Sequence, residues 1–229
     1  MKVLLIREGE IDDILIPPLI TTIAISNNIH WPLDFNADIR KEFQKGTGFG
    51  SVKSAVQRLT EAYDKDPELI NKLFNKVIII LDGKGTKAAQ DEIKKMIKNR
   101  ENFMLAIAIK EVEAWVLADR DHVIEWLKVS KNDCPNCRFW EKGYQPENDH
   151  DPKQTLSELV SSSDISEYDY WATGAANDFI EQYWKGTNYS NEDVNVNNWM
   201  GRANLLQMKE KCPRGFGVFY SPLISFLGK

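Results

Sequence analysis

Three short stretches of the chain are apolar at almost every position, without the polar alternation of a half-exposed strand. They cover residues 2–7, 77–81 and 103–109, and the middle one reads Val-Ile-Ile-Ile-Leu. Continuous apolar runs of this length, rich in β-branched residues, are typical of strands that helices cover on both faces. The pattern therefore predicts three buried strands.

Between these runs, apolar residues recur at the spacing of a helix. Asp12 and Asp13 can cap or charge the first helix start, and Pro17-Pro18 belong in its first turn or at a kink. A glycine-rich stretch at 46–50 predicts a flexible loop, with Ser51 as the N-cap of the helix after it. The predicted helices cover residues 14–25, 52–63, 67–74, 87–99 and 112–129. Because strands and helices alternate, we expect an α/β fold with a mainly parallel sheet and flanking helices.

The pattern changes after residue 129. Residues 130–151 are polar, aromatic and rich in turn-forming types, and no further strand is evident. Helical patches follow at 153–161, 175–184, 200–211 and 218–227. We therefore predict an α/β core over residues 1–129 and a mostly helical C-terminal part over 130–229, packed on that core.

Composition and charge narrow the class of protein. Of 229 residues, 42% are hydrophobic and 28% charged, which excludes collagen-like and disordered classes. Lys and Arg number 29 against 34 acids, a net charge of −5, so a freestanding basic DNA clamp is not expected. A nucleic-acid substrate would need a partner protein to help hold it. With no signal or membrane segment and an odd count of 3 cysteines, we expect a cytoplasmic protein.

Acidic residues follow the predicted strands. Glu8 comes after the first, Asp82 after the second and Glu111 after the third, with Glu113 close behind. Functional crevices of open α/β sheets lie at the carboxyl ends of the strands, and converging carboxylates suit Mg²⁺ or Mn²⁺. The alternative is that each acid caps a helix or favours its N-terminal dipole.

Three segments resemble one protein family. They are Leu-Ile-Arg-Glu-Gly-Glu at 5–10, Ile-Ile-Leu-Asp-Gly at 79–83, and Ile-Lys-Glu-Val-Glu-Ala-Trp-Val-Leu-Ala-Asp at 109–119. Together they are similar to the DUF4276 proteins, Toprim-like proteins related to the RloB group and common in prokaryotic defence loci. Asp-Pro-Lys at 151–153 and Cys-Pro-Arg-Gly-Phe at 212–216 also resemble the C-terminal half of that family.

The resemblance implies a Toprim-like core with a Mg²⁺ site. Glu8 would be its glutamate and Asp82 the first aspartate of an Asp-x-Asp pair, but the second position holds Lys84. A lysine ammonium cannot bind Mg²⁺, although it can contact a phosphate. Glu111 or Glu113 would then supply the missing carboxylate.

Two functions follow from this resemblance. The first is a metal-dependent nuclease of anti-phage defence that hydrolyses phosphodiesters with an ATPase or similar partner. Its catalytic groups would be Glu8, Asp82, Glu111 and Glu113, with Lys84 positioning phosphate. The alternative is a catalytically degenerate structural or regulatory subunit, marked by Lys84. Either is compatible with an oligomer.

The cysteines and Trp115 are further candidates for a functional role. Cys134 and Cys137 have the spacing of half a structural zinc site, and His150 and Cys212 are the distant candidates to complete it. The alternative for the pair is two reduced thiols in a loop. Trp115 has helical spacing with apolar neighbours, which predicts a core anchor and not a base-stacking residue.

Overall fold

The computed structural model describes residues 1–9, 12–29, 33–35, 37–83, 87–163 and 204–228. Its chain forms two compact units, one of residues 1–108 and 219–229 and one of residues 109–218. The sequence predicts a boundary near residue 129 instead. The units divide earlier because the helix after the third strand packs with later helices, and the last helix returns to the first unit.

A parallel sheet forms the centre of the first unit. Its strands are β1 (Val3–Arg7), β2 (Lys76–Asp82) and β3 (Phe103–Ala108), in the order β1-β2-β3. Ile79 of β2 pairs with Ile6 on one side and Leu105 on the other. All five residues of β1 are buried, as are the first six of β2. The three predicted strands and the α/β class are therefore confirmed.

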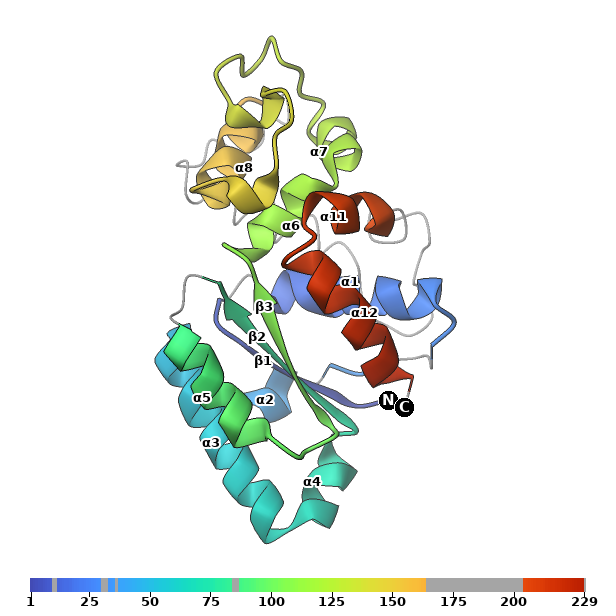
Figure 1. Ribbon diagram of the computed structural model, residues 1–229. Coiled ribbons are helices and arrows are strands. Elements are labelled where there is room, and N and C mark those ends of the chain that lie inside the picture. Colours follow the sequence, from blue (N-terminus) through green and yellow to red (C-terminus); the bar gives the residue numbers. More distant parts are fainter. Residues whose placement is uncertain (10–11, 30–32, 36, 84–86, 164–203, 229) are drawn as a thin grey trace. The chain divides into compact units, whose positions relative to one another are not determined.

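Helices cover both faces of this sheet (Figure 1). On one face lie α3 (Gly48–Lys65) and α5 (Lys87–Ile97), with α4 (Pro67–Leu73) at the end of α3. Apolar side chains of β1, β2 and these helices form a core there, including Leu4, Val56, Leu59, Phe74 and Ile93. On the other face lie α1 (Asp12–Ser26) and α12 (Phe216–Leu227), with Pro17 and Pro18 inside α1.

The outer edge of β1 is covered by the chain that follows α1. Val3 N donates to Asp34 O at 2.8 Å. Gln44 is the residue directly after α2 (Ala37–Phe43). The Gln44 amide accepts from Arg7 N at 3.2 Å and donates to Arg7 O at 2.5 Å, as a neighbouring strand would. This cover satisfies main-chain groups that an open edge would leave exposed.

The start of α3 differs from the sequence prediction. The helix begins at Gly48, with Thr47 at its N-cap, so part of the predicted loop is helical. Gly46 and Gly48 have φ of 82° and 80°, values open to glycine but costly for other residues. Ser51 lies inside the helix, where its hydroxyl donates to Lys45 O at 2.8 Å. The two glycines, not Ser51, set the beginning of the helix.

The second unit is helical. Its described elements are α6 (Val112–Ala118), α7 (Arg120–Leu127), the 3₁₀ turns η1 (Arg138–Trp140) and η2 (Pro146–Asn148), α8 (Pro152–Ser161) and α11 (Leu205–Lys211). Every residue of α6 is buried, and α6 packs against α7, α8 and α11. Trp115 is 1% exposed and its ring meets Phe216 edge-on at 5.6 Å, so its prediction as a core anchor is confirmed.

The single helix predicted over 112–129 is wrong, because the chain breaks at Asp119. This residue has φ of −85° and ψ of 61°, between α6 and α7. Its buried carboxylate accepts from Asn204 N at 3.1 Å and contacts His122 Nδ1 at 2.9 Å. The predicted helix at 175–184 lies outside the described residues.

Candidate functional site

The carboxyl ends of β1 and β2 bring Glu8 and Asp82 together. Parallel pairing sets Arg7 opposite Ile80, so the chain after β1 runs beside the end of β2. Glu8 Oε2 accepts a hydrogen bond from the Asp82 main-chain nitrogen at 3.0 Å. Both residues are only partly buried, which leaves their strand end accessible to solvent. Two of the four predicted metal ligands therefore lie at the ends of neighbouring strands, with the Glu8 carboxylate against the main chain of Asp82.

Main-chain hydrogen bonds hold both acids in place. Glu8 O accepts from Gly48 N at 2.8 Å, and Gly9 N donates to the buried Asp12 carboxylate at 2.8 Å. Asp12 is the first residue of α1, so this bond ties the chain after β1 to the start of that helix. On β2, the residue after Asp82 donates its N–H to Ala108 O at 2.6 Å, which continues the pairing with β3.

Glu111 and Glu113 are the remaining carboxylates of the predicted site. Glu111 and Glu113 belong to the second unit, and their membership of the same metal site stays a prediction. Glu111 occupies the N-cap position of α6, but its side chain makes no capping hydrogen bond, so the capping alternative fails there. Glu113 is 7% exposed on α6. Lys84 lies outside the described residues.

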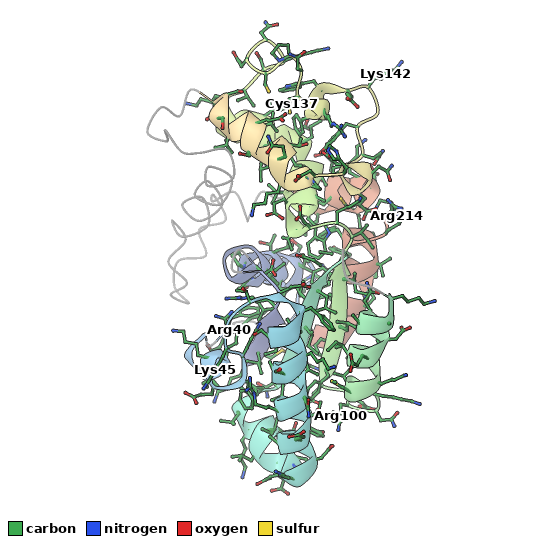
Figure 2. All side chains as sticks on the ribbon, turned by 90° about the vertical axis from the view of Figure 1, so that its left-hand side faces the viewer. Arg40, Lys45, Arg100, Cys137, Lys142 and Arg214 are labelled. Atoms are coloured by element: carbon green, nitrogen blue, oxygen red, sulfur yellow. The ribbon has the colours of Figure 1, made fainter. Side chains whose placement is uncertain are left out.

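A basic hollow adjoins the strand end that carries Glu8. It measures about 190 Å³ and is lined by Arg7, Arg40, Lys41, Gln44, Gly46 and Thr47. Three of these side chains are cationic and none is acidic. Arg40, labelled in Figure 2, lies on α2 and is 9% exposed, and Arg7 is 7% exposed. Such a hollow suits an anion, and Thr47 places it at the N-terminus of α3.

The sequence reasoning missed this hollow. Arg7 falls at the end of the first predicted strand, and the net charge of −5 argues against a basic surface. One signal was present: a basic residue directly precedes the strand-end acid Glu8. Arg7 and Arg40 line one hollow because α2 packs beside β1, and no local pattern predicts that packing.

A second cluster of candidate ligands lies in the second unit. The Sγ atoms of Cys134 and Cys137 and a carboxylate oxygen of Glu158 all lie within 4.8 Å of one another. Cys137, labelled in Figure 2, is 2% exposed, whereas Cys134 and Glu158 are partly buried. Burial raises the pKa of the Cys137 thiol to about 12, and the neighbouring Cys134 and Glu158 add to the rise.

The predicted completion of this cysteine pair by His150 and Cys212 is wrong. Cys212 is fully buried, and its thiol donates to Ala114 O at 3.3 Å. The His150 side chain is exposed, and its Nδ1 lies 2.5 Å from Arg138 Nη1. The third candidate ligand is instead Glu158, which the sequence reasoning did not consider.

The Cys-Pro-Arg-Gly-Phe segment at 212–216 has a structural role in the second unit. Glu147 is 3% exposed and accepts from Arg214 N at 3.1 Å, from Arg214 Nε at 3.3 Å and from Gly215 N. Arg214 Nη2 also donates to Asn148 Oδ1 at 2.8 Å. These contacts tie the segment to η2 and give Arg214 and Gly215 a structural role.

Comparison of the chain with protein-family models, with curated proteins and with solved structures found no match. Across the part of the chain that the structure describes, no helix is both long and apolar enough to cross a membrane.

Proposed function

We propose that this protein is a Mg²⁺- or Mn²⁺-dependent phosphodiesterase of nuclease type, with a Toprim-like catalytic edge. The observation that carries the proposal is the strand end where the Glu8 carboxylate accepts from the main-chain nitrogen of Asp82, beside a basic hollow. Acids alone at strand ends suit many roles. Acids next to a cationic hollow suit a reaction at a phosphate, because the acids can bind a metal cation and the hollow can bind the phosphate anion.

The donor chemistry of the cluster fits Mg²⁺. Glu8 and Asp82 offer hard carboxylate oxygens from rigid neighbouring strands, and Mg²⁺ commonly takes one or two carboxylates and keeps several waters. When bound, such an ion lowers the pKa of a water and stabilises charge on phosphorus. Glu111 and Glu113 are the proposed additional ligands.

The chain's own residues would divide the remaining work. Arg7, Arg40 and Lys41 line the hollow and would hold a phosphate by charge and, for the arginines, by paired hydrogen bonds. Glu8 would accept a proton from the attacking water as general base. Because the hollow is small and the net charge is −5, a long nucleic acid would need further support from a partner, which we propose is an ATPase or another defence subunit.

Cleavage assays test this function. Purified protein would be incubated with labelled single- and double-stranded DNA and RNA, with Mg²⁺, Mn²⁺ or EDTA. We expect metal-dependent cleavage that falls roughly 100-fold or more in Glu8→Gln and in Asp82→Asn. Arg40→Gln should raise KM more than it lowers kcat. Glu68→Gln, at an exposed acid of α4, is the matched control and should cleave normally.

The second candidate is a catalytically degenerate subunit, favoured by the lysine at position 84. A site built this way would bind the cation or a phosphate without hydrolysis. Cleavage that persists equally in Glu8→Gln and wild type would contradict the nuclease proposal. Absent cleavage, together with Mg²⁺ binding that Glu8→Gln abolishes, would favour the degenerate subunit.

A further inference from the structure

We propose that the second unit binds one Zn²⁺ through Cys134, Cys137 and Glu158, with a water in the fourth position. The site is independent of the strand-end carboxylates and of the function proposed for them. It rests on two thiols and one carboxylate, both kinds of ligand that zinc binds, gathered within 4.8 Å of one another. Its role would be to fasten the 130–151 loop to α8.

The loop geometry brings the two thiols together. Cys137 N donates to Cys134 O at 3.1 Å, which closes a turn over the two intervening residues. Trp140 N then donates to Cys137 O at 3.1 Å and begins η1. The two-residue spacing of metal-binding cysteine pairs works in the same way, because one turn sets both sulfur atoms against one ion.

Helix α8 supplies the third ligand. The Cys137 thiol approaches Thr155 O at 3.9 Å, which sets the cysteine against this helix. Glu158 lies three residues beyond Thr155, on the same helical face. Gln154 Nε2 donates to Glu158 Oε1 at 3.2 Å and orients the carboxylate. Partners of this kind around a ligand typically fix its orientation in metal sites.

The loop and the helix are joined next to the cluster by a separate contact. Asp149, 4% exposed, accepts from Tyr144 Oη at 2.8 Å and from Thr155 Oγ1 at 2.6 Å. Tyr144 and Asp149 belong to the loop and Thr155 to α8. The three ligands are therefore held near one another before any ion binds, which lowers the entropic cost of binding.

The spacing suits zinc with little movement. Zinc bonds of about 2.3 Å to sulfur and about 2.0–2.2 Å to oxygen place tetrahedral ligand atoms roughly 3.3–3.8 Å apart. Because the three ligand atoms lie within 4.8 Å of one another, they would move together by about 1 Å at most to reach these distances. Two thiolates select zinc over Mg²⁺, which requires oxygen ligands. The partial exposure of Cys134 and Glu158 leaves room for the water in the fourth position.

Cobalt and zinc binding test the site. The full chain would be purified with a phosphine reductant, its zinc measured by mass spectrometry, and the metal-free protein titrated with Co²⁺. We expect one equivalent of zinc and a thiolate-to-cobalt charge-transfer band. Cys134→Ser and Cys137→Ser should abolish both, and Glu158→Gln should weaken zinc binding about tenfold or more. Zinc binding should survive Glu8→Gln, which separates this proposal from the proposed function.

Two controls match these variants within the same unit. Cys212→Ser removes a buried thiol outside the cluster, and Glu141→Gln removes an exposed loop carboxylate. Both should keep the full equivalent of metal, with folding checked by circular dichroism. Wild-type protein that binds no Co²⁺ or Zn²⁺ at micromolar metal would overturn the proposal, and so would full zinc binding by folded Cys134→Ser. A disulfide between Cys134 and Cys137 that persists under reductant would also overturn it.

Discussion

Replacing Asp149 with asparagine should destabilise the second unit at neutral pH and leave it almost unaffected in acid. Its carboxylate is buried and accepts three hydrogen bonds: Tyr144 Oη at 2.8 Å, Thr155 Oγ1 at 2.6 Å and Asp151 N at 3.1 Å. Asparagine has nearly the same shape, but it is uncharged and has only one acceptor oxygen. The variant therefore tests the charge of the acceptor with little change in packing.

The magnitude follows from the number of bonds. A hydrogen bond to a charged group contributes about 1.5–3 kcal/mol net, against about 0.5–1.5 kcal/mol for a neutral pair. Losing roughly 1 kcal/mol at each of the bonds predicts a fall of about 2–3 kcal/mol in the free energy of unfolding. Asp149→Ala leaves the three donors without this acceptor, and we expect about 3–5 kcal/mol there.

The pH dependence supplies the sharper test. Burial alone would raise the pKa of Asp149, but the hydrogen bonds from Thr155, Asp151 and Tyr144 outweigh it and lower the pKa below 3.8. A depressed folded-state pKa stabilises the native state fully above the unfolded value, and this stabilisation is lost as pH falls through the folded value. The difference between wild type and Asp149→Asn should thus be complete at pH 7 and shrink below about pH 3.8.

Urea denaturation followed by circular dichroism, at pH 7 and at intervals down to pH 3, measures this difference. Glu141→Gln is the matched control, since it removes an exposed carboxylate from the same loop and should change stability by less than about 0.5 kcal/mol. An Asp149→Asn variant as stable as wild type at pH 7 would refute the reasoning. A destabilisation that stays constant to pH 3 would show that packing, not charge, causes the loss.

Three further predictions test other parts of the fold by the same denaturation assay. Gly215→Ala should cost about 1–3 kcal/mol, because its Cβ would lie 3.0 Å from three packed atoms, whereas Gly217→Ala meets nothing closer than 3.4 Å and should be close to neutral. Burial raises the pKa of Asp119, although His122 opposes the rise. Wild type should therefore lose stability relative to Asp119→Asn as the pH rises from 3.8 through the pKa of the folded state. A gain in relative stability over that range would contradict this. Gln44→Ala exposes two main-chain groups at the edge of β1 and should cost about 1–3 kcal/mol; an unchanged urea midpoint would exclude that role.

The strands were predictable because their information is local. Val77 to Leu81 are apolar at every position, and a short run of this kind, rich in β-branched residues, is typical of a strand covered on both faces. The helix predicted over 67–74 corresponds to α4, and the Asp66 side chain caps it by accepting from Leu69 N at 2.9 Å. Residue type and spacing alone carried these predictions.

The breaks and the clusters were not predictable in this way. Asp119 interrupts a continuous helical pattern through a bond to Asn204, 85 residues away. Glu158 has the pattern of an ordinary acid on a helix, and only the packing of the loop on α8 brings it to Cys137. The same limit applies to the basic hollow, whose arginines come from a strand and from a helix some 30 residues later. Contacts between distant segments decide sites of this kind.

The measurement that tests the central claim most directly is a calorimetric titration of the full chain with Mg²⁺. The strand-end account predicts binding at or below millimolar concentration that Glu8→Gln and Asp82→Asn both abolish and Glu68→Gln leaves unchanged. Wild-type protein that takes up no Mg²⁺ at millimolar concentration would contradict it, and so would binding that survives both substitutions.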